Sequence, residues 1–153
     1  MRTALERLLR PRSVAIIGAS PTPNSLGRSV LVNLEQIGFP GEIHLVNPKR
    51  TEIEGRPCVA SIEALPEGID CAVLAIPRAG AIAAIEACGK RGMGGAVVFS
   101  AGFAEVGEEG RAAQAELARV ASAAGMAIEG PNCLGLINYV DRAALSFSIA
   151  YPQ

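Results

Sequence analysis

The chain has 153 residues, of which 50% are hydrophobic and 19% charged, and its formal net charge is −1. This length fits one domain, residues 1–153, with a single core, and the high hydrophobic content excludes a disordered chain. The charges are balanced and form no basic block, which argues against nucleic acid or an anionic membrane surface as a partner. No apolar run reaches the ~18–20 residues of a membrane span, and no signal-peptide pattern is present. We therefore expect a soluble, cytoplasmic protein.

Apolar runs bounded by glycine or proline alternate along the chain with segments of helical periodicity. Buried strands are predicted at 13–17, 42–46, 71–76, 95–99 and 126–128. Helices are predicted at 26–37, around Ile82 and Ile85 up to Gly89–Gly92, and from Glu108 to Gly125. Residues 1–10 are expected to form an N-terminal extension, and 49–69 a long connection with a short extended piece around Cys58. The alternation predicts an α/β fold with a doubly wound, mostly parallel, Rossmann-like sheet.

The C-terminal segment has a different pattern, because large apolar residues alternate with small ones from Ala144 to Tyr151. This period of two predicts a half-buried strand. The chain ends two residues later, so we expect residues 144–153 to be a trailing strand that leads into a further domain.

The cysteines and the single histidine do not form a metal-binding pattern. No Cys-x-x-Cys pair occurs, whereas a zinc site needs closely spaced Cys or His ligands. Cys58, Cys71 and Cys88 are expected as small buried residues. His44 lies between apolar residues of a predicted strand, so we expect a buried imidazole.

In open α/β sheets, ligands bind beyond the carboxyl ends of the strands. The first predicted strand is followed there by a glycine- and serine-containing turn that opens a helix, a geometry able to hold a phosphate. The candidate residues in this turn are Gly18, Ala19, Ser20, Asn24, Ser25 and Gly27. The Gly-x-Gly-x-x-Gly pattern of dinucleotide sites is missing, because Ser20 replaces its second glycine; a tight turn without a ligand therefore remains an alternative.

The second predicted strand ends in Asn47-Pro48-Lys49-Arg50. An NAD site has a carboxylate at this point to bind the ribose hydroxyls. A cation here suits a phosphorylated ribose, as in NADP or coenzyme A, although a solvated Lys-Arg turn would look the same.

The remaining strand ends also contain small, proline or hydroxyl residues that allow a ligand close to the backbone. The candidates there are Ile76, Pro77, Arg78, Ala101, Gly102, Phe103, Asn132 and Cys133. A redox or nucleophilic role for the Cys133 thiol is the less favoured alternative, because no base is predicted beside it.

Five ordered blocks resemble the N-terminal coenzyme A-binding domain of the NDP-forming acyl-CoA synthetases. This family includes ADP-forming acetate–CoA ligase and is similar to the succinyl-CoA synthetase α subunit. The blocks are Ser13-Val-Ala-Ile-Ile-Gly-Ala-Ser20, Asn33-Leu34 with Gly38-Phe39, Val46-Asn-Pro-Lys49, Ser100-Ala-Gly-Phe-Ala-Glu105 and Gly130-Pro-Asn-Cys-Leu-Gly135. The resemblance as a whole runs from about Leu8 to Tyr151.

The resemblance implies that the turn from Gly18 to Ser20 meets the coenzyme A phosphates or pantetheine, and that Lys49 meets a phosphate. It places Pro77 and its neighbours at the nucleotide end, and Gly102-Phe103 with Asn132-Cys133 towards the thiol. It also implies a reaction in which phosphate passes from an acyl phosphate through a phosphohistidine to ADP or GDP.

That phosphohistidine belongs to a later domain of the family, and His44 lies outside every matching block. We therefore expect the chain to bind coenzyme A or acyl-CoA without catalysis of its own, and to work with the remaining ligase domains in cis or as a partner subunit. The alternatives are an NADP-binding oxidoreductase domain and a stand-alone coenzyme A-binding regulatory protein. The acid, the choice of ADP or GDP and the oligomeric state stay open.

Overall fold

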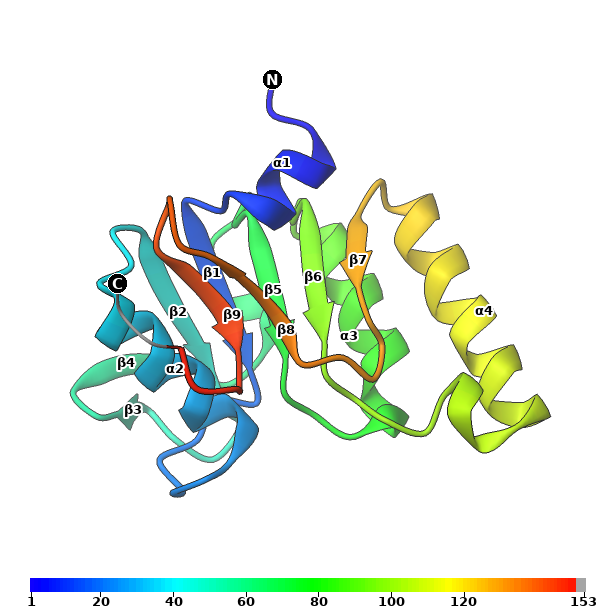
Figure 1. Ribbon diagram of the computed structural model, residues 1–153, viewed down its shortest axis with the longest axis horizontal. Helices are drawn as coiled ribbons and strands as arrows, with labels where there is room; N and C mark the ends of the chain where they lie inside the picture. The colour runs from blue at the N-terminus through cyan, green and yellow to red at the C-terminus, as the bar shows by residue number, and fades with distance from the viewer. Residues whose placement is uncertain (151–153) are drawn as a thin grey trace.

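The computed structural model describes residues 1–150 and contains a seven-stranded sheet at its centre (Figure 1). The parallel strands are β1 (Ser13–Ile17), β2 (Glu42–Val46), β4 (Arg56–Val59), β5 (Cys71–Leu74), β6 (Gly95–Val98) and β7 (Ala127–Glu129). The short strand β3 (Glu52–Ile53) pairs antiparallel with β4 at one edge, which gives the order β3-β4-β2-β1-β5-β6-β7. The predicted doubly wound, mostly parallel α/β sheet is confirmed.

Helices and a hairpin cover the two faces of the sheet. One face packs against α3 (Arg78–Lys90), α4 (Glu108–Ala123) and the 3₁₀ turn η1 (Ile62–Ala64), and a second 3₁₀ turn, η2 (Ala104–Val106), precedes α4. The other face packs against α1 (Ala4–Leu9), α2 (Leu26–Ile37) and a hairpin formed by β8 (Gly135–Asn138) and β9 (Ala143–Ser146). The prediction for α2 is confirmed at both ends, because Ser25 caps its N-terminus and left-handed Gly38 ends it.

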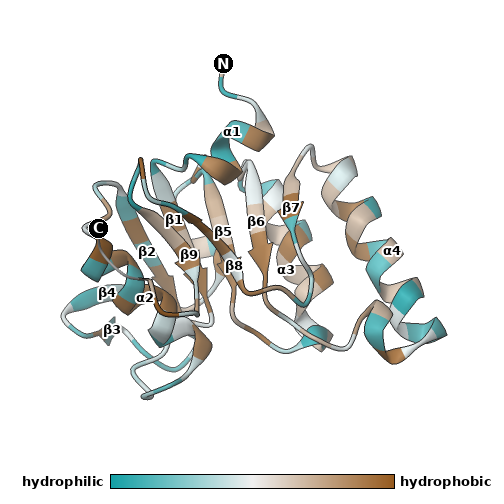
Figure 2. Ribbon diagram, in the orientation of Figure 1, coloured by the Kyte–Doolittle hydropathy of each residue, from teal (hydrophilic) through white to brown (hydrophobic). Residues whose placement is uncertain are grey.

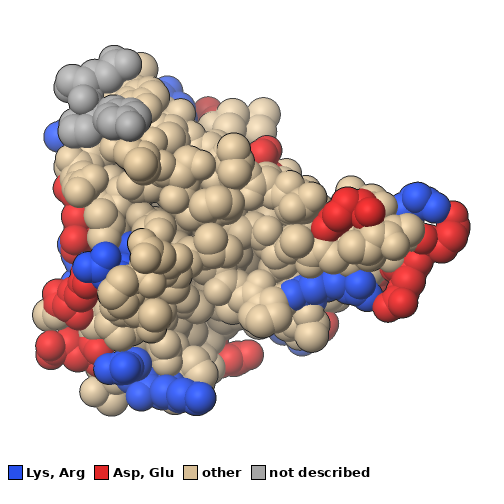
Figure 3. Space-filling view, turned by 60° about the horizontal axis from the view of Figure 1, so that its bottom comes forward, with Lys and Arg blue, Asp and Glu red and all other residues tan. Residues whose placement is uncertain are grey.

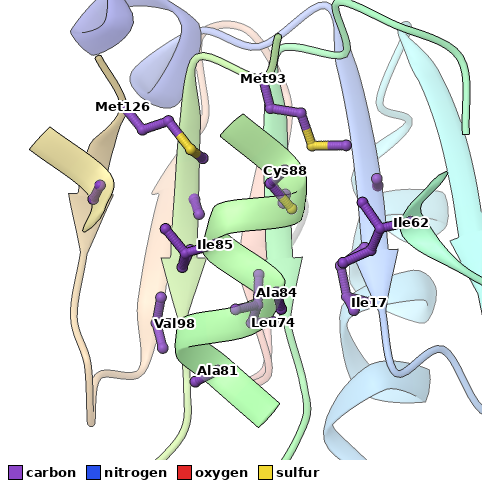
Figure 4. Close-up of a cluster of buried hydrophobic side chains, with 14 of the residues drawn as sticks. Ile17, Ile62, Leu74, Ala81, Ala84, Ile85, Cys88, Met93, Val98 and Met126 are labelled. Carbon is purple, nitrogen blue, oxygen red and sulfur yellow. The ribbon is translucent and has the colours of Figure 1, made fainter. Parts of the chain in front are cut away.

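The central strands β1, β5 and β6 are almost entirely apolar because each faces a packed layer on both sides (Figure 2). In β1, Ala15 and Ile17 point to the α3 side, while Val14 and Ile16 point to the α2 side. Figure 4 shows how α3 fits closely on the sheet, with its small residues Ala81, Ala84 and Cys88 and the larger Ile85 over Leu74 and Val98.

Residues 1–10, predicted as an N-terminal extension, pack against the sheet through α1, where Leu8 alone is buried. Leu8 of α1 is buried, and a Cβ on Gly95 would lie 2.8 Å from the Leu8 Cβ. Gly94 and Gly95, side by side, leave the space that α1 needs. The buried Asp70 carboxylate then accepts hydrogen bonds from the side chains of Arg2 and Arg7 and from the Arg12 backbone.

The trailing strand also differs from its prediction. Strand β9 ends at Ser146, and all four of its residues are buried, because it pairs with β8 in the separate hairpin and lies against α2. The Asn33 amide of α2 donates to the carbonyl oxygens of Ser146 and Ser148 at 2.7 and 2.6 Å, which fixes the segment after β9. Beyond it, Ile149 is exposed and Ala150 buried, and Tyr151 lies outside the described residues.

His44 is half-buried, so the expectation of a buried imidazole is wrong. Strand β4 pairs only with Leu45 and Val46 of β2, which leaves the first half of β2 without an outer neighbour. The His44 Nε2 atom lies 3.0 Å from an exposed carboxylate oxygen of Glu42. Within residues 1–150, no helix has the length and apolar character needed to cross a bilayer.

Candidate functional site

The parallel strands all end at the edge of the sheet that lies at the bottom of Figure 1 and is turned forward in Figure 3. Along this edge the strands follow the order β2, β1, β5, β6, β7, so the row of strand ends spans roughly 19 Å at ordinary strand spacing. Figure 3 shows a mostly uncharged surface here, with charged side chains at its borders. The candidate site residues lie in the loops after these strands and in the first turns of the helices that follow, namely Gly18, Ala19, Ser20, Asn24, Ser25, Gly27, Asn47, Lys49, Ile76, Pro77, Arg78, Ala101, Gly102, Phe103, Asn132 and Cys133.

The β1–α2 turn is held close to both neighbouring strands. Gly18 and Ala19 donate their backbone N–H groups to the Val46 carbonyl, each at 3.1 Å. Gly18 has a positive φ of 89°, and a Cβ there would lie 2.3 Å from the Ala75 carbonyl oxygen. This glycine therefore serves close packing of β1 against β5, and its missing side chain faces the protein.

Gly27 fills the place of a helix-packing glycine in this turn. A Cβ on Gly27 would lie 2.1 Å from the Gly18 carbonyl oxygen, so the first turn of α2 rests directly on the backbone after β1. In dinucleotide-binding sites the third glycine of the motif allows this close helix–strand contact. The sequence lacks that spacing, yet the close contact is retained because the glycine comes later in the loop.

Hydrogen bonds within the turn orient its polar residues. The Ser20 hydroxyl accepts the Thr22 N–H at 3.0 Å, and the Ser25 hydroxyl donates to the Thr22 carbonyl at 2.8 Å. Asn24 adopts a positive φ of 63°. In the first turn of α2 the Ser25 hydroxyl accepts the Arg28 N–H, whereas the Leu26 and Gly27 N–H groups have no intrahelical acceptor; a helix start of this kind can face an anion beyond the edge.

The end of β2 is tied to the β1 turn and presents a cation. The Asn47 amide donates to the Ala19 carbonyl at 2.8 Å, and its side-chain oxygen accepts the Lys49 N–H at 2.8 Å. Lys49 is exposed, and no carboxylate of residues 1–150 lies within 4.0 Å of its ammonium group. Asn47 thus fixes the turn that holds Lys49.

The loops after β5 and β6 are joined by Arg78. Its guanidinium donates to the Gly102 carbonyl at 2.6 Å and to the Glu109 carboxylate at 2.8 Å. The Gly102 N–H donates in turn to the Glu105 carboxylate, and backbone N–H groups around this carboxylate, that of Gly102 first, lower the Glu105 pKa. The sequence analysis gave no role to Glu105 or Glu109. Their partners, Gly102 and Arg78, are known only from the fold, and without them both look like ordinary solvated carboxylates near the start of a helix.

The other candidates in these loops contribute mainly backbone or surface. Ile76 is half-buried, and Pro77 and Ala101 are exposed. Phe103 is completely buried in the core on the α3 side, so its ring cannot contact a ligand at the edge and only its backbone can.

At the end of β7, the loop crosses back over β6. The Asn132 N–H donates to the Ser100 carbonyl at 3.0 Å, and the Ser100 hydroxyl donates to the Ile76 carbonyl at 2.6 Å. Cys133 is half-buried with its sulfur 3.4 Å from the Val98 carbonyl oxygen, and burial, the largest cause, raises its thiol pKa. A raised pKa disfavours a thiolate nucleophile.

Two hollows lie away from this edge. One, of about 660 Å³, is lined by Arg2, Arg12, Arg142 and their neighbours near the starts of β1 and β2, and the other, of about 440 Å³, lies between α3 and α4. The strand-end surface has the first turn of α2 and the exposed Lys49 ammonium near β1 and β2, and the ion pair of Arg78 with Glu109 further along.

Comparisons with known proteins agree with this geometry. The family described as "CoA binding domain" matches residues 12–139. The chain is 54% identical over 94% of its length to a trans-feruloyl-CoA synthase from an unknown prokaryotic organism, and 42% identical over 97% to ADP-forming acetate–CoA ligase I of Archaeoglobus fulgidus. It spans 20% and 22% of these proteins.

A solved structure and a further relative show the domain in other contexts. The dinucleotide-forming acetyl-coenzyme A synthetase 1 of Ca. Korarchaeum cryptofilum superposes with a TM-score of 0.88 at 36% identity, over 94% of this chain and 30% of that one. The α subunit of ADP-forming acetate–CoA ligase II from Pyrococcus furiosus is 37% identical over 88% of this chain, which covers 29% of the subunit. Among the relatives, the domain thus occurs both in single-chain ligases and in separate α subunits.

Proposed function

Because the chain belongs to the family of coenzyme A-binding domains, we propose that it serves as the coenzyme A-binding part of an NDP-forming acid–CoA ligase. Coenzyme A is the ligand of this family, and the named relatives, which differ in their acids, are all synthases or ligases of CoA thioesters. The chain spans only about a fifth of the first of these proteins, so the ligase reaction of the whole protein is part of the proposal.

The proposed binding site depends on two groups at the ends of β1 and β2, namely the backbone N–H groups that begin α2 and the Lys49 ammonium. The close β1–α2 turn leaves first-turn N–H groups available, and the exposed Lys49 ammonium lies at the end of the neighbouring strand. Coenzyme A needs both, because it has a diphosphate and a phosphorylated ribose. NAD has the diphosphate but no phosphate on its ribose. Its ribose hydroxyls would need a carboxylate after β2, where this chain has Asn47-Pro48-Lys49.

We assign the ligand an extended path along the row of strand ends. The ribose phosphate lies by Lys49, the diphosphate by the turn from Gly18 to Gly27 and by Pro77 with its neighbours, and pantetheine continues past Gly102. The thiol end then reaches the loop with Asn132 and Cys133. This path follows the strand order β2, β1, β5, β6, β7 and uses each candidate loop once.

The chain by itself supplies binding and orientation. A phosphoryl-transfer route through the enzyme needs a nucleophile that accepts the phosphate, and His44 lies in the middle of β2, beside Glu42 and away from the strand ends. The relatives extend well beyond this domain, and we propose that the acyl phosphate and the phosphohistidine are handled by such further domains, in the same chain or in a partner subunit.

The test is a calorimetric titration of the chain with coenzyme A, NADP and NAD. We expect coenzyme A to bind and NAD to show no binding. Binding of NADP in preference to coenzyme A would instead support an oxidoreductase domain, and tight NAD binding would contradict the assignment. Release of CoA from acyl-CoA on addition of the other ligase domains separates a ligase part from a stand-alone regulatory protein.

A further inference from the structure

Arg78 stands out at the candidate site because its charge is already engaged. It is the first residue of α3, directly after Pro77 at the end of β5, and its side chain is one-third exposed. One terminal nitrogen donates to the Gly102 carbonyl at 2.6 Å, and the other donates to the Glu109 carboxylate at 2.8 Å. The guanidinium thus lies between the loop after β5 and the loop after β6.

The carboxylate partner is held weakly. The Glu109 side chain is 87% exposed and lies in the first turn of α4. Exposed ion pairs contribute little to stability, because water solvates both charges well and ordering two long side chains costs entropy. Phosphate oxygens form charge-assisted, frequently bidentate hydrogen bonds with an Arg fork, and a diphosphate has more negative charge than the single Glu109 carboxylate.

The position of Arg78 makes one part of coenzyme A the best competitor. A Cβ on Gly18 would touch the Ala75 carbonyl, so the phosphate-binding turn after β1 lies against the end of β5, three residues before Arg78. Lys49 lies on the opposite side of β1, at the end of β2. Along the proposed path, the diphosphate at the β1 turn is the phosphate group on the Arg78 side of β1, and the ribose phosphate is the one on the Lys49 side.

We propose that Arg78 exchanges partners when coenzyme A binds: the diphosphate displaces Glu109, which acts as an intramolecular competitor in the unliganded protein. The bond from Arg78 to the Gly102 carbonyl is kept, so the exchange couples ligand binding to the position of the loop after β6. This inference rests on the proposed function. It identifies Glu109 as a residue that lowers the affinity for coenzyme A, whereas the other site residues raise it.

The test is a double-mutant cycle on coenzyme A affinity, measured by calorimetry at one fixed ionic strength. We expect Glu109→Gln to bind coenzyme A about two- to fivefold more tightly, the range set by an exposed ion pair. Arg78→Gln should bind at least about tenfold more weakly, because a charge-assisted hydrogen bond is lost. In the Arg78→Gln background, Glu109→Gln should have no further effect.

Glu108→Gln is the matched control. Glu108 is equally exposed, lies in the same first turn of α4 and pairs with Arg111, so its substitution changes the net charge identically without freeing Arg78. Equal gains in Glu108→Gln and Glu109→Gln would mean a general charge effect and would overturn the exchange. A merely structural role of Glu109 predicts a lower melting temperature with no gain in affinity, which would also overturn it.

Dephospho-coenzyme A identifies the displaced group. It keeps the diphosphate but lacks the ribose phosphate, so the penalty of Arg78→Gln should persist with it. Loss of that penalty would assign Arg78 to the ribose phosphate and reject the diphosphate. If the wild-type chain binds coenzyme A but Arg78→Gln binds it equally well, the exchange is wrong while the proposed function stands; absence of wild-type binding refutes the function itself.

Discussion

Replacing Gly27 by alanine tests whether the close approach of α2 to the β1 turn forms the phosphate site. The new Cβ would lie 2.1 Å from the Gly18 carbonyl oxygen and 3.1 Å from the Ala19 Cα. The first turn of α2 must then move by roughly 1 Å to restore an ordinary contact. Gly27 has no left-handed backbone, so this displacement is the main effect of the substitution.

Two energies follow from that displacement. Overpacking costs about 1–3 kcal/mol, and the higher helix propensity of alanine returns about 1 kcal/mol, so the net loss of stability is at most ~2 kcal/mol. Binding should suffer more, because a misplacement of about 1 Å at a site that positions charged groups costs up to ~100-fold. We therefore expect a chain that remains folded, with coenzyme A affinity reduced roughly 10- to 100-fold.

Gly80→Ala is the control for this experiment. Gly80 lies in the first turn of α3 at the same edge, but a Cβ there would lie 3.5 Å from the Ile76 Cδ1, an ordinary contact. This variant should be unchanged in affinity and stabilised by about 0.5–1 kcal/mol. The assays are calorimetry with coenzyme A and thermal unfolding. Equal affinities of Gly27→Ala and Gly80→Ala would refute the argument that this helix contact shapes the site.

Three further predictions concern a phosphate contact, a buried carboxylate and the histidine. Lys49→Ala should weaken coenzyme A binding by roughly 10- to 100-fold but leave dephospho-coenzyme A binding unchanged by calorimetry; an equal loss for both ligands would give Lys49 another role. Burial alone would raise the pKa of Asp70, but hydrogen bonds from the Arg12 backbone, Arg7 and Arg2 outweigh it and lower the pKa. Its stabilising effect is thus present above the ordinary Asp pKa and disappears as the pH falls, so Asp70→Asn should cost about 3 kcal/mol in urea unfolding at pH 7 and much less in acid; a pH-independent difference would contradict this. The chain incubated with radiolabelled ATP, ADP and acyl-CoA should not become phosphorylated, and labelling that His44→Asn abolishes would show the opposite.

The succession of strands and helices along the chain, and the sheet edge where the candidate site lies, could be predicted from local sequence. Strands of four or five apolar residues, bounded by Gly or Pro and separated by helical segments, permit few arrangements besides a doubly wound sheet. The site follows from that topology, because all parallel strands end at one edge and Lys49 comes at the end of β2. These features depend on periodicity and chain order, which the sequence determines by itself.

Tertiary structure decided the features that depend on distant partners. Leu8 and the Arg2–Arg7–Asp70 cluster make α1 part of the core, although the first ten residues have no strong periodicity of their own. The strand pairing of β9 and its clamp by Asn33 connect residues more than a hundred positions apart. The exposure of His44 depends on where β4 begins to pair with β2. The engagement of Arg78 by Glu109 likewise needs α3 and α4 side by side, since the strength and partner of a surface charge are set by neighbours in space and leave no trace in local sequence pattern.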